Sequence, residues 1–321
     1  KRIAIAFMAA AIACSGPAEE TPTTVGNPYL PLWEHIPDGE PYVFEDPDNP
    51  GQYRVYIYGS HDSRITDYCG RELVAWSAPV DDLNEWRYDG EILRVSHNAE
   101  GKPVSEEGLS DVLFAPDVAI KKEADGSVMY YLYPNDQVGG RQNLIAKSPR
   151  PDGPFEVCNW NPENPDQTVG VLGFDPAVFV DDDGTAYFIS TIEENQHLGL
   201  FRLSDDYLSA VEYTELFKWK SREAPAIVRV GDTYYMLSSA CTGWDPNPCM
   251  LSYSKSLTEG WSELKQVGNS IAFDTQAASI LTIKGTKQTS HLYVGDRWQD
   301  PRLPESKTII FPISFTADSC V

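Results

Sequence analysis

Short runs of β-branched and aromatic residues, bounded by Gly, Pro and Asp, recur along the chain after residue 28, where helical periodicity is nearly absent. Such runs are typical of β-strands. Five of them resemble one another, and they cover residues 54–59, 128–133, 185–190, 233–238 and 290–295. Most follow a turn signal such as Asp183-Gly184, and another β-prone run precedes each turn. Each unit is therefore predicted to contain a β-hairpin.

A second feature follows most of these runs about 15 to 20 residues later. It consists of Trp-Ser-Ala-Pro at 76–79, Ala-Lys-Ser-Pro at 146–149 and Tyr-Ser-Lys-Ser at 253–256. Two features that repeat in phase at about 50 to 70 residues indicate a repeat architecture. Five antiparallel units of about four strands predict an all-β fold, a five-bladed β-propeller, whereas a β-sandwich does not explain the phase. Residues 29–44 and 311–315 are expected to supply the strands that close the ring.

The N-terminal residues have the pattern of an export signal. A basic pair precedes an apolar run that is shorter than the ~20 residues of a membrane-spanning helix. The residues before Cys14 resemble a bacterial lipobox, and an ordinary signal peptide with an incidental cysteine is the alternative. We expect a signal peptide over 1–13, a flexible tether over 14–27 and one propeller domain over 28–321. The protein would then be an exported, periplasmic or cell-surface lipoprotein, with the lipid on Cys14 as its membrane contact.

The remaining cysteines follow no zinc-binding spacing, and they are Cys69, Cys158, Cys241, Cys249 and Cys320. In an exported protein Cys241 and Cys249 could close a small loop as a disulfide. Two buried thiols are the alternative.

The charge balance limits the classes of partner. The chain has 25 Lys and Arg against 48 Asp and Glu, a net charge of −23. A nucleic-acid binder or a protein that binds anionic lipid needs a basic surface, which this composition does not indicate. A neutral substrate is easiest to reconcile with so acidic a chain.

Three acidic positions recur at similar offsets before the hairpin turns. Asp38 or Glu40 comes from the first unit, Asp175 from the third and Glu223 from the fourth. The inner strand of each propeller blade lines the central channel, so we expect these carboxyl groups to converge on one pit. A glycosidase requires such a set: an acid for the leaving oxygen, a carboxylate to activate water, and a neighbour that raises the pKa of the acid. Taken singly, an Asp before Pro is common in turns and a Glu at a strand start is usually solvated.

Four groups of residues carry a family resemblance. They are residues 27–40 with 58–62, 114–117, 174–184, and 223–225 with 231–235. The chain from Asn27 to about Phe315 resembles glycoside hydrolase family 43, whose members are five-bladed propellers that invert the anomeric centre. The resemblance implies that Asp38 is the general base, Asp175 the pKa modulator and orienter, and Glu223 the general acid. Counting back from the turn favours Asp38 as the base, whereas the Asp-Pro pattern of the third blade favours Glu40.

Three motifs nearer the C-terminus resemble one branch of this family. Residues 242–247, 273–276 and 294–298 are similar to the galactan 1,3-β-galactosidase branch, although the first blade is not. In that branch a Gln at the position of Gln276 is implied to help the base. Many family members carry a His there, near a central calcium ion. Because the histidines of this chain lack ligand spacing, we expect no metal and no cofactor.

Aromatic and polar side chains near the motifs suit sugar binding. We expect substrate contacts from Glu40, Trp244, Gln276, Arg297 and Trp298. A buried ion pair within the fold is the alternative for Arg297. Trp33 also lies near a motif, whereas four other tryptophans in or near the repeated feature are expected to pack between strands, and they are Trp76, Trp86, Trp219 and Trp261.

Together these patterns predict an exo-acting, inverting glycoside hydrolase that removes terminal arabinofuranosyl, galactosyl or xylosyl residues from plant-type polysaccharides. We expect a monomer with an oligo- or polysaccharide substrate and no nucleic-acid partner. Two alternatives are a non-catalytic carbohydrate-binding propeller of an exported glycan-capture system and a retaining glycosidase. The separation of the carboxyl groups distinguishes the two stereochemical courses.

Overall fold

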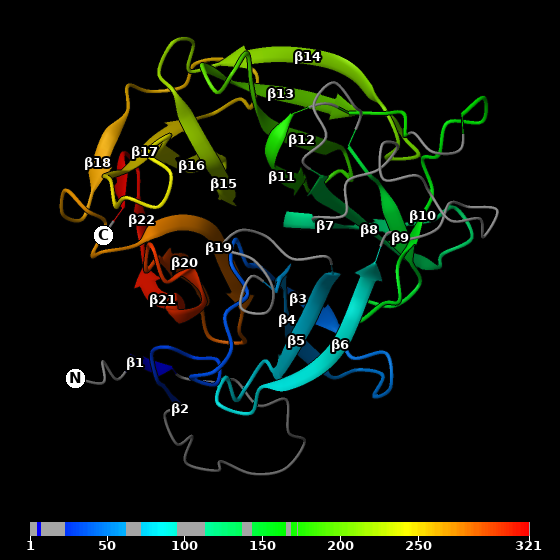
Figure 1. Ribbon diagram of the computed structural model, residues 1–321, viewed down its shortest axis with the longest axis horizontal. Coiled ribbons are helices and arrows are strands. Elements are labelled where there is room, and N and C mark those ends of the chain that lie inside the picture. Colours follow the sequence, from blue (N-terminus) through cyan, green and yellow to red (C-terminus); the bar gives the residue numbers. More distant parts are fainter. Residues whose placement is uncertain are drawn as a thin grey trace.

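The computed structural model describes residues 5–7, 23–61, 72–94, 113–136, 143–164, 168–171 and 173–320. Five antiparallel sheets stand around a central axis, so the predicted five-bladed, all-β propeller is confirmed (Figure 1). The described residues include one short 3-10 helix, η1 (Leu303–Glu305), and no helix among them is long and apolar enough to span a membrane. Cys14, Cys69 and most of the expected signal and tether lie outside the described residues, apart from the paired strands β1 (Ile5–Phe7) and β2 (Thr23–Val25).

Blades 1 to 4 have four strands each, and blade 5 has three. From the axis outwards, the strands are β3 (Glu40–Glu45), β4 (Tyr53–Ser60), β5 (Glu72–Pro79) and β6 (Arg87–Arg94) in blade 1; β7 (Leu113–Lys122), β8 (Val128–Asp136), β9 (Ala146–Ser148) and β10 (Glu156–Val157) in blade 2; β11 (Phe174–Val180), β12 (Ala186–Ile192), β13 (His197–Leu203) and β14 (Ala210–Leu216) in blade 3; β15 (Arg222–Val230), β16 (Thr233–Ala240), β17 (Cys249–Ser254) and β18 (Lys265–Val267) in blade 4; and β19 (Gln276–Lys284), β20 (Thr289–Arg297) and β21 (Lys307–Ile313) in blade 5. The inner strands β3, β7, β11, β15 and β19 contact one another around the axis (Figure 1).

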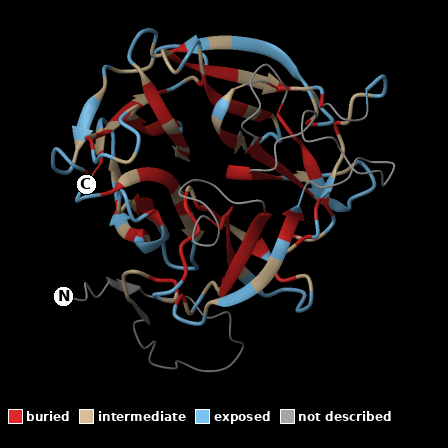
Figure 2. Ribbon diagram, viewed as in Figure 1, coloured by how far each residue is buried: buried red, intermediate tan, exposed pale blue. Residues whose placement is uncertain are grey.

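The strands nearer the axis are more deeply buried than the strands at the outer rim. The second strand of each blade is packed by neighbouring blades on both faces, so it consists of a nearly continuous apolar run rather than an alternating one. In β4 every residue from Val55 to Ser60 is buried, whereas the outer strand β14 is exposed along most of its length (Figure 2). Phe44, Tyr56 and Leu132 belong to one core cluster that joins blades 1 and 2. The hydrophobic core therefore lies between the blades.

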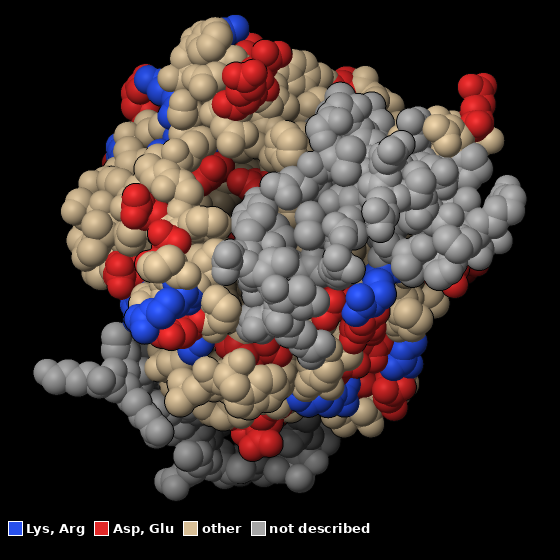
Figure 3. All heavy atoms as spheres, viewed as in Figure 1, with Lys and Arg blue, Asp and Glu red and all other residues tan. Residues whose placement is uncertain are grey.

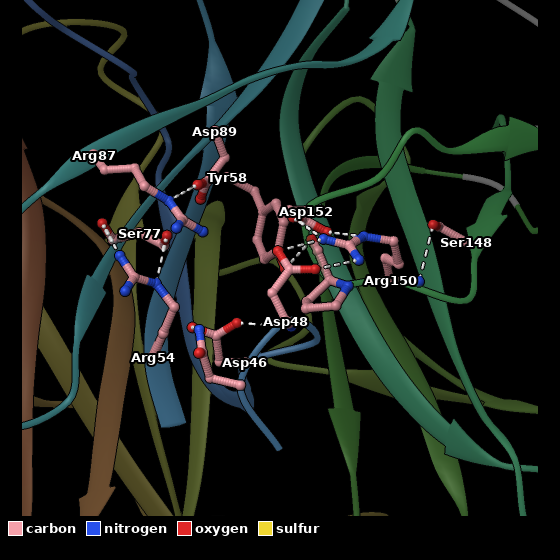
Figure 4. Close-up of polar contacts among 12 residues, drawn as sticks. Asp46, Asp48, Arg54, Tyr58, Ser77, Arg87, Asp89, Ser148, Arg150 and Asp152 are labelled. Atoms are coloured by element: carbon pink, nitrogen blue, oxygen red, sulfur yellow. Dashed lines mark hydrogen bonds and ion pairs between the residues drawn. The ribbon is translucent and has the colours of Figure 1, made fainter. Parts of the chain in front are cut away.

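Polar contacts reinforce the junction of blades 1 and 2 (Figure 4). The buried hydroxyl group of Tyr58 donates a hydrogen bond to the carbonyl oxygen of Pro151, at 2.7 Å. The guanidinium group of Arg150 binds both carboxylate oxygens of Asp48, at 3.0 and 3.1 Å, and also binds Asp152. These bonds connect residues about 100 positions apart in the chain, and the bidentate pair fixes their orientation.

Strands form in part of each segment that was expected to close the ring, as β3 (Glu40–Glu45) and the end of β21 (Lys307–Ile313). A side chain supplies the rest of the closure. Residues 26–39 form no strand, because their prolines lack the N–H groups of a β-ladder. Instead, the side chain of Asn27 donates to the carbonyl oxygen of Ile310 at 2.7 Å and accepts from its N–H group at 2.9 Å. One amide thus replaces a strand at the edge of β21. The C-terminal hairpin, β22 (Phe315–Thr316) and β23 (Ser319–Cys320), contacts blade 4 through a hydrogen bond from Tyr235 to Thr316.

We expect the Asn27→Ala variant to lose about 1–3 kcal/mol of unfolding free energy, because both main-chain groups of Ile310 lose their partner. Urea unfolding followed by tryptophan fluorescence measures the change. Gln288→Ala is the matched control, since the exposed Gln288 makes one 3.5 Å side-chain bond within its own hairpin. Equal stability of the two variants would show that the Asn27 contact does not hold the ring closed.

Candidate active site

The N-terminal ends of the inner strands meet at a constriction of the central channel. Its lining includes Asp38 and Glu40 of blade 1 and Asp175 of blade 3, with backbone and small side chains from blades 2, 4 and 5. The volume is ≈ 20 Å³, which is room for about one water molecule. Beyond Glu40 the channel widens to ≈ 630 Å³ toward the opposite end of the inner strands. Figure 3 shows acidic side chains near the middle of the ring on the face it presents.

The backbone at this mouth adopts a similar conformation in four blades. Asp38, Ala115, Asp175 and Ala224 have positive φ values of 52°, 38°, 49° and 46°, which non-glycine residues rarely adopt. Each lies two residues before the position where uninterrupted pairing with the next strand begins, and in blades 2, 3 and 4 the pairing is broken there by a β-bulge. Bulges redirect side chains, and such strain clusters at functional sites. Asp38 and Asp175 thus occupy equivalent positions.

Glu223 and Asp175 form an acidic pair. Glu223 is only 8% exposed, and burial together with the negative charge of Asp175 raises the pKa of Glu223 to about 7. Burial also raises the pKa of Asp175, to about 6. The structure therefore brings together two carboxyl groups that are 48 positions apart in the sequence, as the repeat predicted. Near neutral pH Glu223 exists in both protonation states, which suits a proton donor.

The amide of Gln276 binds Glu223. Its Nε2 atom donates to Oε1 of Glu223 at 2.9 Å and lies 3.3 Å from Oγ of Ser239. Its Oε1 atom accepts a hydrogen bond from the indole N–H of Trp298 at 2.7 Å. Trp298 therefore fixes which end of the amide faces Glu223. The structure brings Gln276 and Trp298 into the site, as expected from the sequence.

The carboxyl groups of blade 1 have different surroundings. The N–H group of Asp38 donates to Oδ2 of Asp296 at 2.7 Å, which anchors the backbone at the mouth. Glu40 is 7% exposed, and burial and the nearby charge of Asp117 raise its pKa well above the usual range. Asp117 accepts hydrogen bonds from the Tyr42 hydroxyl group and from two backbone N–H groups, so its role is to join blades 1, 2 and 3.

Arg297 and Trp244 were expected, like Gln276, to contact the substrate. Arg297 donates to the carbonyl oxygens of Phe273 and Asp274, at 3.0 and 3.2 Å, and thus holds the loop before β19. Nε of Arg297 also lies 3.8 Å from Oδ2 of Asp274, so an ion pair within the fold forms, but at the surface and not buried as that alternative had it. Trp244 is half-buried in the loop between β16 and β17. Asn247 ties that loop to Ser239, beside Gln276, with hydrogen bonds of 2.9 and 3.3 Å, and the sequence analysis did not single out Asn247.

Cys241 and Cys249 are free thiols, contrary to the expected disulfide. Cys241 is turned toward Glu223, with which it forms a hydrogen bond, and burial and the charge of Glu223 raise its pKa to about 12. Cys249 is buried on the other side of the blade, close to Cys320. A spacing of eight residues says nothing about these directions, so sequence alone did not place a thiol beside Glu223.

Among the residues that the structure describes, no group of three or more His, Cys, Asp or Glu side chains is arranged to hold a metal ion. The expectation of no metal and no cofactor stays a prediction.

Comparisons with known proteins agree with this geometry. A xylosidase/arabinosidase from Thermoclostridium stercorarium is 35% identical over 239 residues, which are 67% of this chain and 46% of that protein. An arabinoxylan arabinofuranohydrolase from Bacillus subtilis (strain 168) is 34% identical over 149 residues, 42% of this chain and 28% of that protein. The crystal structure of an exo-β-1,3-galactanase from Clostridium thermocellum superposes with a TM-score of 0.69 and 27% identity, over 89% of this chain and 61% of that chain.

This chain spans less than half the length of either of the two relatives aligned by sequence. The family model described as glycosyl hydrolases family 43 matches residues 43–298, which is most of the chain. The protein therefore belongs to glycosyl hydrolase family 43.

Proposed function

We propose that this protein is an exo-acting glycoside hydrolase that cleaves terminal glycosidic bonds with inversion. The observation that carries the proposal is the buried pair of Asp175 and Glu223 beside the mouth of the central channel, with the pKa of Glu223 raised to about 7. A protein that only binds sugars has no use for an acid tuned in this way. Family membership supports the same conclusion.

Glu223 acts as the general acid. Because Gln276 donates a hydrogen bond to Oε1 of Glu223, the transferable proton resides on Oε2. That proton passes to the leaving oxygen as the glycosidic bond breaks. Burial of Glu223, and then the negative charge of Asp175, raise the pKa of Glu223 to about 7 and so keep part of it protonated near neutral pH.

Asp38 is the proposed general base. It lines the mouth at the position equivalent to Asp175, and a base must be ionised to take a proton from water. Burial and the charge of Asp117 raise the pKa of Glu40 well above its usual range, which makes Glu40 less suited to the role of base. Glu40 lines the same constriction as Asp38.

The substrate class follows from the relatives. The similar proteins are named for xylosidase, arabinosidase and exo-β-1,3-galactanase activities. We therefore propose terminal arabinofuranosyl, galactosyl or xylosyl residues of plant-type polysaccharides as substrates, and neutral sugars suit a chain of net charge −23. Export as a lipoprotein through Cys14, a monomeric state and the lack of a cofactor are parts of the same proposal.

Glu223→Gln is expected to lower kcat on an oligosaccharide by about 10²- to 10⁴-fold, because the leaving sugar oxygen loses its proton donor. The loss should be smaller on a nitrophenyl glycoside of the same sugar, whose leaving group needs little protonation. Asp175→Asn should lower kcat on the oligosaccharide by at least tenfold. Glu259→Gln, at an exposed carboxylate of blade 4, is the control with normal rates. Wild-type rates in Glu223→Gln with an unchanged circular dichroism spectrum would refute the assignment.

The pH dependence of the rate should reflect the pKa of Glu223 and the effect of Asp175 on it. Since Glu223 must be protonated, kcat/KM on an oligosaccharide should fall as pH rises through about 7, the pKa of that group. The charge of Asp175 raises this pKa, so Asp175→Asn should move the alkaline limb to lower pH. Rates measured from pH 5 to 9 decide the matter. A limb that stays in place in the variant would show that Asp175 does not tune the acid.

The stereochemical course can be read directly. If water attacks from the face opposite Glu223, the first sugar released has the inverted anomeric configuration. Proton NMR during the first minutes of hydrolysis, before mutarotation, detects it. Retention would remove the role of Asp38 as a base that activates water.

A further inference from the structure

Trp219 is exposed although the sequence placed it among the packing tryptophans. Its side chain is 67% exposed, whereas Trp76 is 3% exposed in the blade 1 core. An exposed indole is not unusual by itself. Its anchoring and its place on the fold are what set this residue apart.

His197 contacts both the backbone and the ring of Trp219. The backbone N–H group of Trp219 donates to Nδ1 of His197 at 2.9 Å, and the two rings meet edge-on with centroids 4.5 Å apart. Because Nδ1 accepts this bond, the ring proton resides on Nε2, which lies 3.2 Å from Oε1 of Glu215. Lys218 binds the same carboxylate at 3.1 Å, with its ammonium group 6.0 Å from the indole centroid. The backbone of Trp219 is therefore anchored, and the His197 ring and the Lys218 ammonium group lie against the indole while most of its surface stays open.

The segment that carries Trp219 is strained. Phe217, Trp219 and Ser221 have φ values of 49°, 58° and 49°, a conformation that is a genuine outlier for bulky residues. The N–H group of Ser221 donates to the carbonyl oxygen of Gln196 at 3.3 Å, which ties the segment to the β12–β13 loop. Strain of this kind persists where the surroundings impose it, and it clusters at ligand-binding sites.

Trp219 lies on the same end of blade 3 as the acidic pair. It precedes Glu223 by four residues, so the two Cα atoms are at most about 14 Å apart. Phe174, which is 44% exposed and next to Asp175, pairs with Thr191 of β12, and Thr191 in turn pairs with the residue after His197. Phe174 and the anchor of Trp219 are thus about two strand spacings apart, roughly 10 Å. The two exposed rings extend outward from the carboxyl groups along one blade end.

The position of Trp219 relative to Glu223 indicates which part of the substrate Trp219 would contact. A general acid protonates the leaving oxygen, so the part of the polysaccharide that leaves lies on the acid's side of the cleaved bond. We propose that Trp219, with Phe174 nearer the mouth, forms a stacking platform for neutral sugar rings of the leaving chain, beyond the first sugar after the cleaved bond. The apolar C–H face of a sugar covers an aromatic ring, as in other sites where an amphipathic ring meets a partly polar ligand. This inference rests on the proposed glycosidase function.

The test compares short and long substrates. The wild-type protein is first assayed on nitrophenyl arabinofuranoside, xyloside and galactoside. The sugar of the glycoside that it cleaves decides which trisaccharide and polysaccharide are used as the longer substrates. In Trp219→Ala we expect kcat/KM on these longer substrates to fall about tenfold, mainly through KM, and to stay within twofold on the nitrophenyl glycoside. Trp219→Phe should restore most of the loss. Tyr213→Ala is the control, because Tyr213 is a 51% exposed aromatic on β14 of the same blade.

The outcomes separate the platform from the proposed function. An equal loss on both substrates, or none on either, would overturn the platform while the glycosidase proposal stands. If the wild type cleaves no substrate, the function fails, and calorimetric titration of β-1,3-galactotriose, xylotriose and arabinotriose then tests the platform alone. Binding that weakens about tenfold in Trp219→Ala but not in Tyr213→Ala supports it. Binding to none of the three, or equal binding to both variants, overturns it.

Discussion

The desolvation of the Glu223 carboxyl group, next to the charge of Asp175, is the constraint on which the rest of the site depends. Burial raises the pKa of Asp175 to about 6, and burial together with the charge of Asp175 raises the pKa of Glu223 to about 7. The arrangement works against stability, and it persists because the ring around it is rigid. Gln276 and Cys241 each donate a hydrogen bond to Glu223 and so limit the loss of its hydration. Trp298 orients Gln276 for this task.

Two other buried carboxyl groups, those of Asp117 and Asp296, have a structural role. Asp117 accepts bonds from Tyr42 and from the backbone of blades 2 and 3, while Asp296 anchors the N–H group of Asp38. These carboxyl groups serve as joints between blades that share no β-ladder. Their partners separate these two carboxyl groups from Glu223: Asp117 and Asp296 accept hydrogen bonds from backbone N–H groups, whereas Glu223 accepts one from the side chain of Gln276.

Two connecting segments of the ring position residues of the site. The strained segment at Trp219, held by His197, and the loop at Phe273, held by Arg297, both lead into an inner strand that begins with a residue of the site or next to one. Side chains that hold such segments are far from the axis, yet they decide where the inner strands start. Positioning and substrate contact therefore share the same short connections.

The sequence by itself determined the fold and the main acidic pair. Strand periodicity and turn signals act over a few residues, and their repetition places Asp175 and Glu223 at matching ends of successive blades without any knowledge of packing. The tertiary structure alone decided which partners these groups meet. The direction of the Cys241 thiol, the exposure of Trp219, the contacts of Arg297 and the raised pKa of Glu40 depend on residues tens to hundreds of positions away, and on how much water reaches them. Such proximity and desolvation arise only when the ring closes, and no local pattern records them.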